Sequence, residues 1–375
     1  MHKKIALVYD AIYPYIKGGS EKRYYELADS LAIKGNEVHL YGMKLWAGPN
    51  IVKKNGVFLH GICKAIPLYT TKGKRSIWQA IYFGISCLKL IREDFDVIDV
   101  NQMPFFNLFF CKIICLIKRK KFIATWNEVW GREYWKEYLG KLGTIAFIVE
   151  WFSARMPDKI ISISNHTTRK LVKELNINTP IYTILVGIDF DYIQRIQPSS
   201  VKSDVIFAGR LLSHKNVDIL IKAINFLKLE LPQIRCLIVG DGPEKKNLQS
   251  LIKELKLAQN ITLLPFLNNH DDLYALMKSS KVFVLPSIRE GFGLVILEAN
   301  ACGIPVITAD HKNNAARDLI IEGKNGYLST LKPNDISLKI LTLIINKNKY
   351  AADCINFAKK YDHNNIVNQI EEVYK

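Results

Sequence analysis

Short apolar runs, separated by amphipathic stretches, recur along the whole chain. In the first half they lie at residues 4–9, 37–41, 96–100, 121–125, 159–164 and 181–186. In the second half they lie at residues 204–208, 234–239, 261–265, 282–285 and 304–308. The stretches between the second set have helical composition and run for about 10–15 residues, which is typical of βαβ units with parallel strands. The pattern therefore predicts an α/β protein built from two doubly wound, Rossmann-like domains.

The periodic pattern breaks between Asp189 and Ser203, where Pro198 is followed by two serines. Such a stretch is typical of a linker. We therefore expect a first domain over residues 1–195 and a second over residues 201–358. Residues 359–375 form a last helical stretch, which we expect to pack back on the first domain. A chain of 375 residues agrees with two domains, because single cores rarely grow that large.

In doubly wound sheets, ligands bind outside the carboxyl ends of the strands. Loops that contain glycine follow several predicted strands, at residues 18–19, 209–215, 240–242 and 290–294. We expect these loops to converge on a cleft between two facing domains.

The loop after the apolar run at 282–285 has the strongest local signal. Gly291 and Gly293 permit a tight turn and leave backbone amides uncovered at the start of a helical stretch. Such amides suit an anion or a sugar hydroxyl. Glu290 lies at the mouth of this turn, and Glu298 lies two turns along the helix on roughly the same side. Glycine-rich turns are common in α/β proteins, so other parts of the chain must decide whether this one is functional.

The formal net charge is +17, and residues 1–200 hold 29 Lys and Arg against 17 Asp and Glu. The basic residues are scattered except at Lys118-Arg119-Lys120-Lys121, and no nucleic-acid-binding module accompanies them, so we expect no nucleic-acid partner. This cluster follows the apolar segment 103–117. Two interpretations remain open: a segment that lies on an anionic membrane surface, or a core helix whose final cations complement its dipole.

Two apolar segments, 77–91 and 103–117, are too short to span a bilayer. The first apolar run ends at Asp10, so we expect no secretory signal and a cytoplasmic protein, peripheral on the membrane if the first interpretation holds. The seven cysteines lie at irregular spacing without a C-x-x-C pair, which predicts reduced thiols and no structural zinc.

Five stretches resemble retaining glycosyltransferases of family 4, which have the GT-B fold. The first is Arg-Glu-Gly-Phe-Gly-Leu-Val-Ile-Leu-Glu-Ala at residues 289–299, in which Glu290 and Glu298 form an E-x7-E pair. The others are Gly18-Gly19-Ser20-Glu21, Phe207-Ala208-Gly209-Arg210 with Lys215, Val239-Gly240-Asp241-Gly242-Pro243, and Ala301-Cys302-Gly303-Ile304-Pro305-Val306. The resemblance covers almost the whole chain in the family's order and is weakest over residues 45–95.

The resemblance implies a nucleotide-sugar donor. Arg210 and Lys215 would stabilise the diphosphate, which gains negative charge as the glycosidic bond breaks. Glu290 would accept hydrogen bonds from the sugar and Glu298 from the ribose. The remaining residues implied in the donor site are Gly18, Gly19, Gly209, Gly242, Gly291, Phe292, Gly293 and Leu294. The resemblance also implies retention of anomeric configuration without a covalent nucleophile, and no metal or other cofactor.

One position departs from the family. Relatives often carry a histidine in the acceptor-side loop, where this chain reads Thr125-Trp126-Asn127-Glu128. Asn127 can hydrogen-bond a sugar hydroxyl, but it cannot titrate near neutral pH. We expect Asn127 to be a catalytic position that slows or redirects transfer. Three tryptophans between residues 126 and 135 could stack on sugar rings or bury the start of the next helix.

We therefore predict a hexosyltransferase of polysaccharide or cell-envelope biosynthesis. It would move a hexose from a UDP- or GDP-sugar to a lipid-linked or growing polysaccharide acceptor. Two alternatives stay open. One is a nucleotide-sugar 2-epimerase on the same fold, and the other is a non-catalytic protein that binds sugar nucleotides or glycans, which the asparagine at position 127 would allow.

Overall fold

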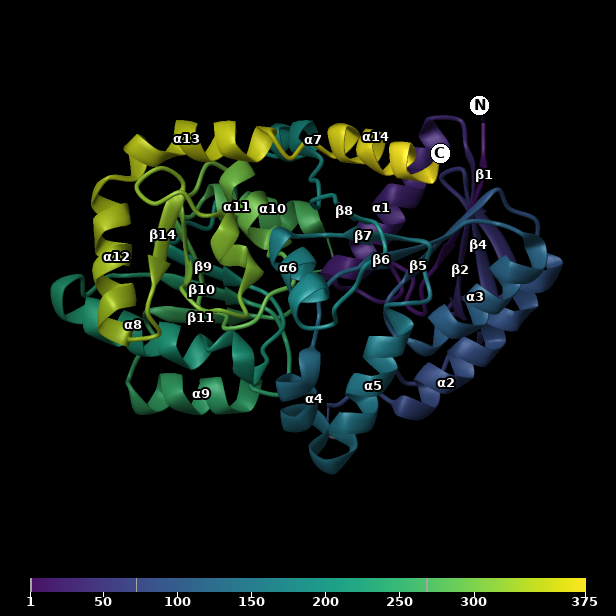
Figure 1. Ribbon diagram of the computed structural model, residues 1–375. Helices are drawn as coiled ribbons and strands as arrows, with labels where there is room; N and C mark the ends of the chain where they lie inside the picture. Colours follow the sequence, from purple (N-terminus) through teal and green to yellow (C-terminus); the bar gives the residue numbers. More distant parts are fainter. Residues whose placement is uncertain (1, 72, 268) are drawn as a thin grey trace. The chain divides into compact units, whose positions relative to one another are not determined.

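The computed structural model describes residues 2–71, 73–267 and 269–375, and it divides into two compact units (Figure 1). Unit 1 comprises Met1–Val186 together with Asn364–Lys375, and unit 2 comprises Gly187–His363. The chain thus passes from unit 1 to unit 2 and returns for its last helix. Each unit is a mainly parallel sheet with helices, which confirms the predicted fold class.

Unit 1 contains an eight-stranded sheet in the order β3-β4-β2-β1-β5-β6-β7-β8. Its strands are β1 (Lys4–Val8), β2 (Glu37–Lys44), β3 (Ile51–Lys54), β4 (Val57–Lys64), β5 (Val97–Asn101), β6 (Phe122–Trp126), β7 (Lys159–Ser162) and β8 (Ile181–Thr183). All neighbours are parallel except β3 and β4. The strands β3 and β4 were not predicted from the sequence. Asn55 and Gly56, both with positive φ, form the two-residue turn that joins them.

The helices of unit 1 cover both faces of its sheet. They are α1 (Gly19–Ile33), α2 (Ile77–Ser86), η1 (Cys87–Arg92), α3 (Phe106–Lys118), α4 (Gly131–Leu139), η2 (Gly140–Leu142), α5 (Gly143–Ser153), α6 (Asn165–Lys173) and α14 (His363–Tyr374). Helices α1 and α14 lie on one side, and α2, α3 and α5 lie on the other (Figure 1). Helix α1 begins at Gly19, and Gly18 occupies its N-cap without a side-chain hydrogen bond, so Ser20 lies inside the helix.

The last helix is tied to unit 1 by a buried carboxylate. Asp99 on β5 is fully buried and accepts hydrogen bonds from the hydroxyls of Tyr24 (3.0 Å), Thr125 (2.9 Å) and Tyr374 (2.6 Å). Burial raises the pKa of Asp99 against the opposing effect of these hydroxyl donors. Tyr374 therefore anchors the end of α14 to the centre of the sheet.

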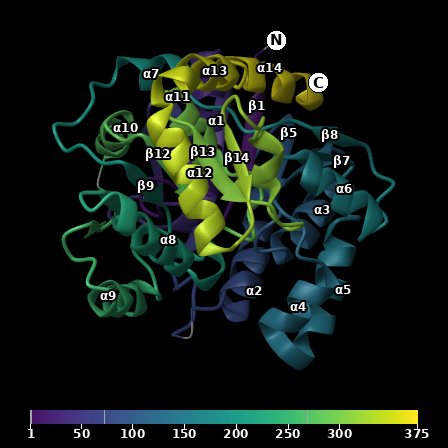
Figure 2. The ribbon, with the colours of Figure 1, turned by 90° about the vertical axis from the view of Figure 1, so that its left-hand side faces the viewer.

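Unit 2 contains a six-stranded parallel sheet in the order β11-β10-β9-β12-β13-β14. Its strands are β9 (Val205–Ala208), β10 (Cys236–Val239), β11 (Ile261–Leu264), β12 (Val282–Leu285), β13 (Val306–Ala309) and β14 (Gly326–Ser329). Its helices are α7 (Phe190–Arg195), η3 (Ser213–Lys215), α8 (Val217–Glu230), α9 (Lys245–Glu254), α10 (His270–Lys278), α11 (Leu294–Ala301), η4 (Ala315–Leu319), α12 (Pro333–Ile345) and α13 (Lys347–Lys359). Figure 2 looks onto α12, behind which β12, β13 and β14 lie side by side.

One helix of unit 2 differs from the sequence-based expectation. Helix α7 lies inside the stretch interpreted as an aperiodic linker, and Asp189 caps it by accepting a hydrogen bond from the amide of Tyr192 at 2.9 Å. Six residues are too few for an apolar periodicity to emerge, so only the cap residue could have indicated this helix.

All seven cysteines are free thiols, as predicted. Within the described part of the chain, no helix is both long and apolar enough to cross a bilayer.

Candidate active site

Two loops at the carboxyl edge of the unit 2 sheet bring a cation and a carboxylate together. Lys215 follows β9 and Glu290 follows β12, 75 residues apart in sequence. The Lys215 Nζ lies 2.5 Å from Glu290 Oε1, and both side chains are mostly buried, at 15% and 14% exposure. This ion pair joins two of the residues that the resemblance assigned to the donor site.

Hydrogen bonds between the two loops hold this pair in place. The side-chain amide of Asn216 donates to the carbonyl of Pro286 at 3.1 Å, and the amide of Ile288 donates to the carbonyl of His214 at 3.0 Å. Ser287 is buried, and its hydroxyl donates to the carbonyl of Arg289 at 2.9 Å. The loop backbones, and therefore Lys215 and Glu290, are positioned by contacts that need no ligand.

A third loop, after β13, braces the Glu290 loop from the other side. Glu290 forms a β-bridge with Asn314, and the amide of Ala315 donates to the carbonyl of Glu290 at 3.0 Å. Asn314 is fully buried and donates to the Thr308 hydroxyl (3.1 Å) and the Ala309 carbonyl (2.8 Å). The sequence analysis missed this brace. Its one signal is a pair of asparagines soon after an apolar run.

Gly293 forms the N-cap of α11 in a conformation that favours glycine. Its φ is +92°, and a Cβ atom there would lie 2.4 Å from the Cβ of Ala316. The N–H of Ile296 donates to the carbonyl of Gly293 at 2.8 Å, and the N–H groups of Leu294 and Val295 come before the first complete turn, so they have no acceptor within the helix. They carry the partial positive charge of the helix N-terminus, as expected for a donor-binding turn.

We expect Gly293→Ala to lower the free energy of unfolding by about 1–3 kcal/mol, because it forces a left-handed alanine into a steric clash. The matched control is Gly19→Ala, since a Cβ atom at Gly19 has no neighbour within 4 Å. Thermal unfolding of both variants measures the difference. Equal melting temperatures for the two variants would contradict this role for Gly293.

The second glutamate of the E-x7-E pair lies in a different environment from the first. Glu298 on α11 is buried, and its Oε1 accepts a hydrogen bond from the hydroxyl of Tyr274 on α10 at 2.8 Å. Tyr274 therefore orients this carboxylate.

Arg210 lies exposed on the loop after β9, next to Gly209. This loop packs closely on the loop after β10. A Cβ atom at Gly240 would lie 1.9 Å from the carbonyl oxygen of Gly209, and one at Gly242 would lie 2.4 Å from that of Leu211. The glycines at 240 and 242 therefore have a packing reason for lacking a side chain, besides the predicted donor contact of Gly242.

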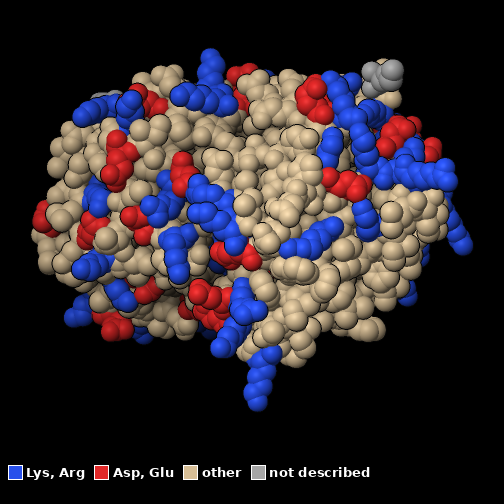
Figure 3. Space-filling view, in the orientation of Figure 1, with Lys and Arg blue, Asp and Glu red and all other residues tan. Residues whose placement is uncertain are grey.

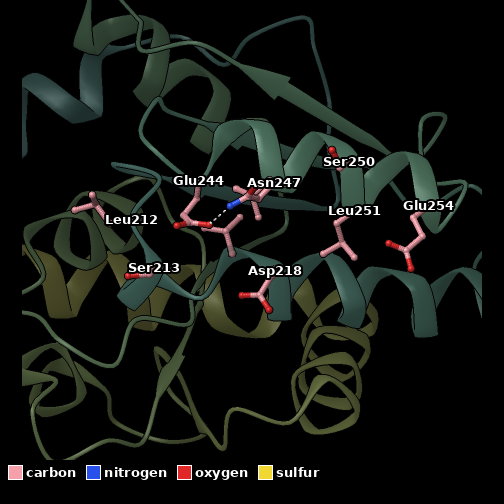
Figure 4. Close-up of a pocket in the computed structure, with 10 residues that line it drawn as sticks. Leu212, Ser213, Asp218, Glu244, Asn247, Ser250, Leu251 and Glu254 are labelled. Atoms are coloured by element: carbon pink, nitrogen blue, oxygen red, sulfur yellow. Dashed lines mark hydrogen bonds between the residues drawn. The ribbon is translucent and has the colours of Figure 1, made fainter. Parts of the chain in front are cut away.

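A surface hollow of about 480 Å³ lies between α8 and α9 (Figure 4). Its lining includes the carboxylates of Asp218, Glu244 and Glu254, and none of its lining residues among those the structure describes is Lys or Arg. Glu244 accepts a hydrogen bond from Asn247 at 2.9 Å. None of the predicted donor residues lines this hollow, and an acidic lining opposes a diphosphate, so we do not place the donor there.

In unit 1, Asn127 follows β6 and is largely buried. Its backbone amide donates to Gln102 Oε1, and its Nδ2 donates to Asn101 Oδ1 at 3.3 Å. Its Oδ1 has no hydrogen-bond partner within the described residues. The side chain is thus fixed at the carboxyl end of the sheet with one acceptor unused. Neither Asn101 nor Gln102 was predicted as a site residue, although both directly follow the predicted strand at 96–100.

Gly18 is the N-cap of α1 and Gly19 is its first residue, and the contact of both glycines with the donor stays a prediction.

An ion pair after β1 was not predicted from the sequence. Asp10, directly after β1, is fully buried and accepts from Arg75 (2.6 Å) and from Gln79 (2.9 Å). Burial alone would lower the pKa of Arg75, but the carboxylate of Asp10 outweighs this effect and raises it. The only indication in the sequence was that Asp10 directly follows the apolar run at 4–9.

The tryptophans of the acceptor-side loop are buried, and Trp126 is fully so. Stacking on sugar rings is therefore wrong, and these side chains instead pack around the start of α4. Glu150 on α5 holds this turn: it accepts from the amides of Trp130 (2.8 Å) and Gly131 (2.9 Å) and from Trp135 Nε1 (2.8 Å). Burial raises the pKa of Glu150 to about 7, although the three donors oppose the shift.

Within the described residues, no group of three or more His, Cys, Asp or Glu side chains is placed to hold a metal ion. That no metal or other cofactor is required stays a prediction.

Comparison with known families agrees with this arrangement. Residues 17–192 match the family described as Glycosyltransferase Family 4, and residues 190–361 match the family described as Glycosyl transferases group 1. The two matches are consecutive and cover most of the chain. The chain belongs to glycosyltransferase family 4. The predicted family is confirmed, and so is the prediction of a glycosyltransferase at the level of the family.

Curated relatives of this family 4 chain match part of it. One, from Campylobacter jejuni, is N-acetylgalactosamine-N,N'-diacetylbacillosaminyl-diphospho-undecaprenol 4-alpha-N-acetylgalactosaminyltransferase, 32% identical over 54% of this chain and 54% of the relative. A glycosyltransferase of Haemophilus influenzae is 32% identical over 38% of this chain and 39% of the relative. The poly(glycerol-phosphate) alpha-glucosyltransferase of Bacillus subtilis is 28% identical over 45% of this chain and 25% of the relative. The chain spans less than two thirds of the length of each.

Solved structures match over nearly the whole chain at low identity. Sucrose-phosphate synthase from Thermosynechococcus elongatus has a TM-score of 0.81 at 17% identity and covers 99% of this chain and 98% of its own. HepE from Anabaena, in complex with UDP and glucose, has a TM-score of 0.76 at 20% identity and covers 99% of both chains. At these identities the likeness establishes the GT-B fold alone.

Proposed function

We propose that this chain is a retaining hexosyltransferase that moves a hexose from a UDP- or GDP-sugar to a lipid-linked or growing polysaccharide acceptor. The observation that carries the proposal is the Lys215–Glu290 pair at the carboxyl edge of the unit 2 sheet. A cation suited to the diphosphate and a carboxylate suited to sugar hydroxyls lie 2.5 Å apart. Lys215 and Glu290 would therefore bind the two sides of the glycosidic bond, the diphosphate and the sugar, at the same place.

Lys215 can serve both partners at once. Its ammonium has three N–H donors, so it can keep its bond to Glu290 while donating to a phosphate oxygen. Arg210, on the same loop, adds a guanidinium that binds phosphate in a bidentate manner. As the anomeric C–O bond breaks, the electron pair moves to the leaving diphosphate, and both cations stabilise the charge that develops. The first amides of α11 add further donors at the Gly293 turn.

The two glutamates bind the donor rather than attack it. Glu290 accepts hydrogen bonds from the sugar hydroxyls, and its pairing with Lys215 leaves it poorly suited to act as a nucleophile. Glu298, oriented by Tyr274, accepts from the ribose hydroxyls. The acceptor hydroxyl then attacks from the face that the diphosphate leaves and gives its proton to the leaving phosphate oxygen, so the anomeric configuration is retained. Asn127 lies directly after β6 with a buried Oδ1 that has no hydrogen-bond partner within the described residues, so a hydroxyl of the acceptor sugar would reach it only if this loop rearranged.

The names of relatives support the substrate classes. HepE binds UDP and glucose in its solved structure, which favours a uridine donor. The Campylobacter relative acts on a diphospho-undecaprenol glycan, which favours a lipid-linked acceptor.

A panel of labelled UDP- and GDP-hexoses, incubated with and without a bacterial lipid extract, tests the proposal. We expect one donor to release its nucleoside diphosphate in an acceptor-dependent manner and to label the lipid fraction. A donor that raises the melting temperature by mass action identifies the nucleotide. An epimerised free sugar from donor alone would establish the epimerase instead, and stabilisation without any turnover would indicate a non-catalytic binding protein.

A further inference from the structure

The helices on one face of unit 1 expose an unusual number of large apolar side chains. On α2 these are Ile77, Trp78 and Ile85, and on α3 they are Ile113, Leu116 and Ile117. Trp78 is 70% exposed, and Leu116 and Ile117 are 66% and 61% exposed. Within each helix the exposed residues follow helical spacing, so each helix has a second apolar stripe directed away from the sheet.

Helix α5 and the short helix η1 extend the same surface. Ile145, Ile148 and Phe152 lie exposed along α5, and Leu88 and Ile91 lie exposed on η1. Helix α3 packs against α2, η1 and α5, so the stripes are neighbours. The contact of α2 with α3 is close, since a Cβ atom at Gly84 would lie 2.8 Å from the Cβ of Phe106. We call the exposed surface of α2, η1, α3 and α5 the apolar face.

The inner sides of these helices already form the core. Leu108, Cys111 and Cys115 of α3 are buried, as are Phe83 of α2 and Cys87 of η1. The core-helix interpretation of the segment 103–117 therefore holds for the inner side of α3, and its outer side is also apolar. That the segment lies on a membrane surface stays a prediction. A helix that is apolar all round is normally covered on its outer side.

The helices of the apolar face carry more cations than carboxylates. The four helices, all of whose residues the structure describes, contain one acidic residue, Glu150, and it is buried. Their cations are Lys89, Arg92, Lys112 and Lys118, and Arg119, Lys120 and Lys121 follow directly. In Figure 3 the area over α2, α3 and α5, at the lower right, is almost free of charged side chains. Two of these cations lie beside exposed carboxylates, since Lys112 pairs with Asp158 at 2.6 Å and Lys120 lies 3.8 Å from Asp96. The cations still outnumber these carboxylates, and an apolar surface with a net positive edge complements anionic lipid headgroups.

We propose that the apolar face docks on the surface of an anionic lipid bilayer, with its apolar side chains inserted below the headgroups. Trp78 would lie at the interface, where tryptophan is favoured. The lysines would extend along the apolar surface to reach lipid phosphates. The inference concerns where the proposed transferase meets a lipid-linked acceptor, but it rests on the surface of unit 1 and its test requires no activity.

Vesicle co-sedimentation tests the proposal. It compares binding to vesicles of phosphatidylcholine alone with binding to vesicles of phosphatidylcholine and phosphatidylglycerol in equal parts. We expect the unmodified protein to prefer the anionic vesicles at least tenfold and to lose this binding in high salt. Leu116→Glu with Ile117→Glu should reduce binding at least tenfold. The matched control is Leu229→Glu with Ile345→Glu, at two unit 2 positions that are 82% and 72% exposed, and it should bind normally. Replacing Lys118 to Lys121 with serine should weaken binding to anionic vesicles only.

Tryptophan fluorescence of the unmodified protein gives a second readout that needs no disruptive variant. Brominated lipids should quench Trp78, and most of the quenching should disappear in Trp78→Phe, because Trp46 and Trp151 (on α5) are half-buried and the other tryptophans are buried. Equal binding to both kinds of vesicle, or unchanged binding of Leu116→Glu/Ile117→Glu, would overturn the proposal. A dimer in solution that this double variant dissociates, without vesicle binding, would instead make the apolar face a contact between copies.

Discussion

The replacements Arg210→Ala and Lys215→Ala should each slow glycosyl transfer by about 10²–10³-fold. This is the usual loss when one stabiliser of developing negative charge is removed. The effect should appear mainly in kcat, because these cations act on charge that grows as the diphosphate leaves. Initial rates with the donor identified by the panel measure it. Near-normal rates in both variants would refute the assignment.

Lys222→Ala is a suitable matched control. Lys222 also pairs with a carboxylate, Asp218, at 2.9 Å, but it lies exposed on α8, away from the Lys215–Glu290 pair. We expect its rate to be unchanged. A second comparison uses the shared contact of Lys215 and Glu290: the double variant Lys215→Ala/Glu290→Gln should lose less than the product of the two single losses. Multiplicative losses would show that the two residues act separately.

Glu150→Gln should produce the largest loss of stability in unit 1. At pH 5 the carboxyl of Glu150 is protonated, but both of its oxygens can still accept hydrogen bonds, whereas the side-chain NH2 of glutamine cannot accept any. Part of the set formed by Trp130, Gly131 and Trp135 is therefore left unsatisfied in a buried site. At pH 5 we expect a loss of about 3 kcal/mol in the free energy of unfolding. Urea unfolding followed by tryptophan fluorescence measures it, and the exposed Glu137→Gln on α4 is the control.

The same variant has a predicted pH dependence. The pKa of Glu150 is about 7 in the folded protein against an ordinary value of 4.5, so the folded state binds more protons between these values. Stability from this group is therefore complete below pH 4.5 and declines as pH rises to 7, by about 3 kcal/mol in total. The difference between the unmodified protein and Glu150→Gln should shrink over this range. A constant difference would show that Glu150 is ionised throughout.

Much of the fold was predictable because buried parallel strands are short and continuously apolar. Strands β9, β10, β12 and β13 could be placed in this way, and the glycine turn at 291–293 marked the start of α11. The exceptions lack that pattern. Strand β3 is mostly exposed, and α7 is a capped helix of only six residues. The tryptophans of the acceptor-side loop left two interpretations open, since burial is not a local property.

The sequence by itself determined the two α/β units, the loops that carry Arg210, Lys215 and Glu290, and the family, because these depend on local composition and on motifs in a set order. Only the tertiary structure decided that Lys215 pairs with Glu290, that Glu150 holds the tryptophan turn, and that Asn314 braces the donor loop. Each of these contacts joins separate segments of the chain. The apolar face has the same origin: α3 is apolar all round, so its sequence could not tell which side meets the sheet and which side remains exposed.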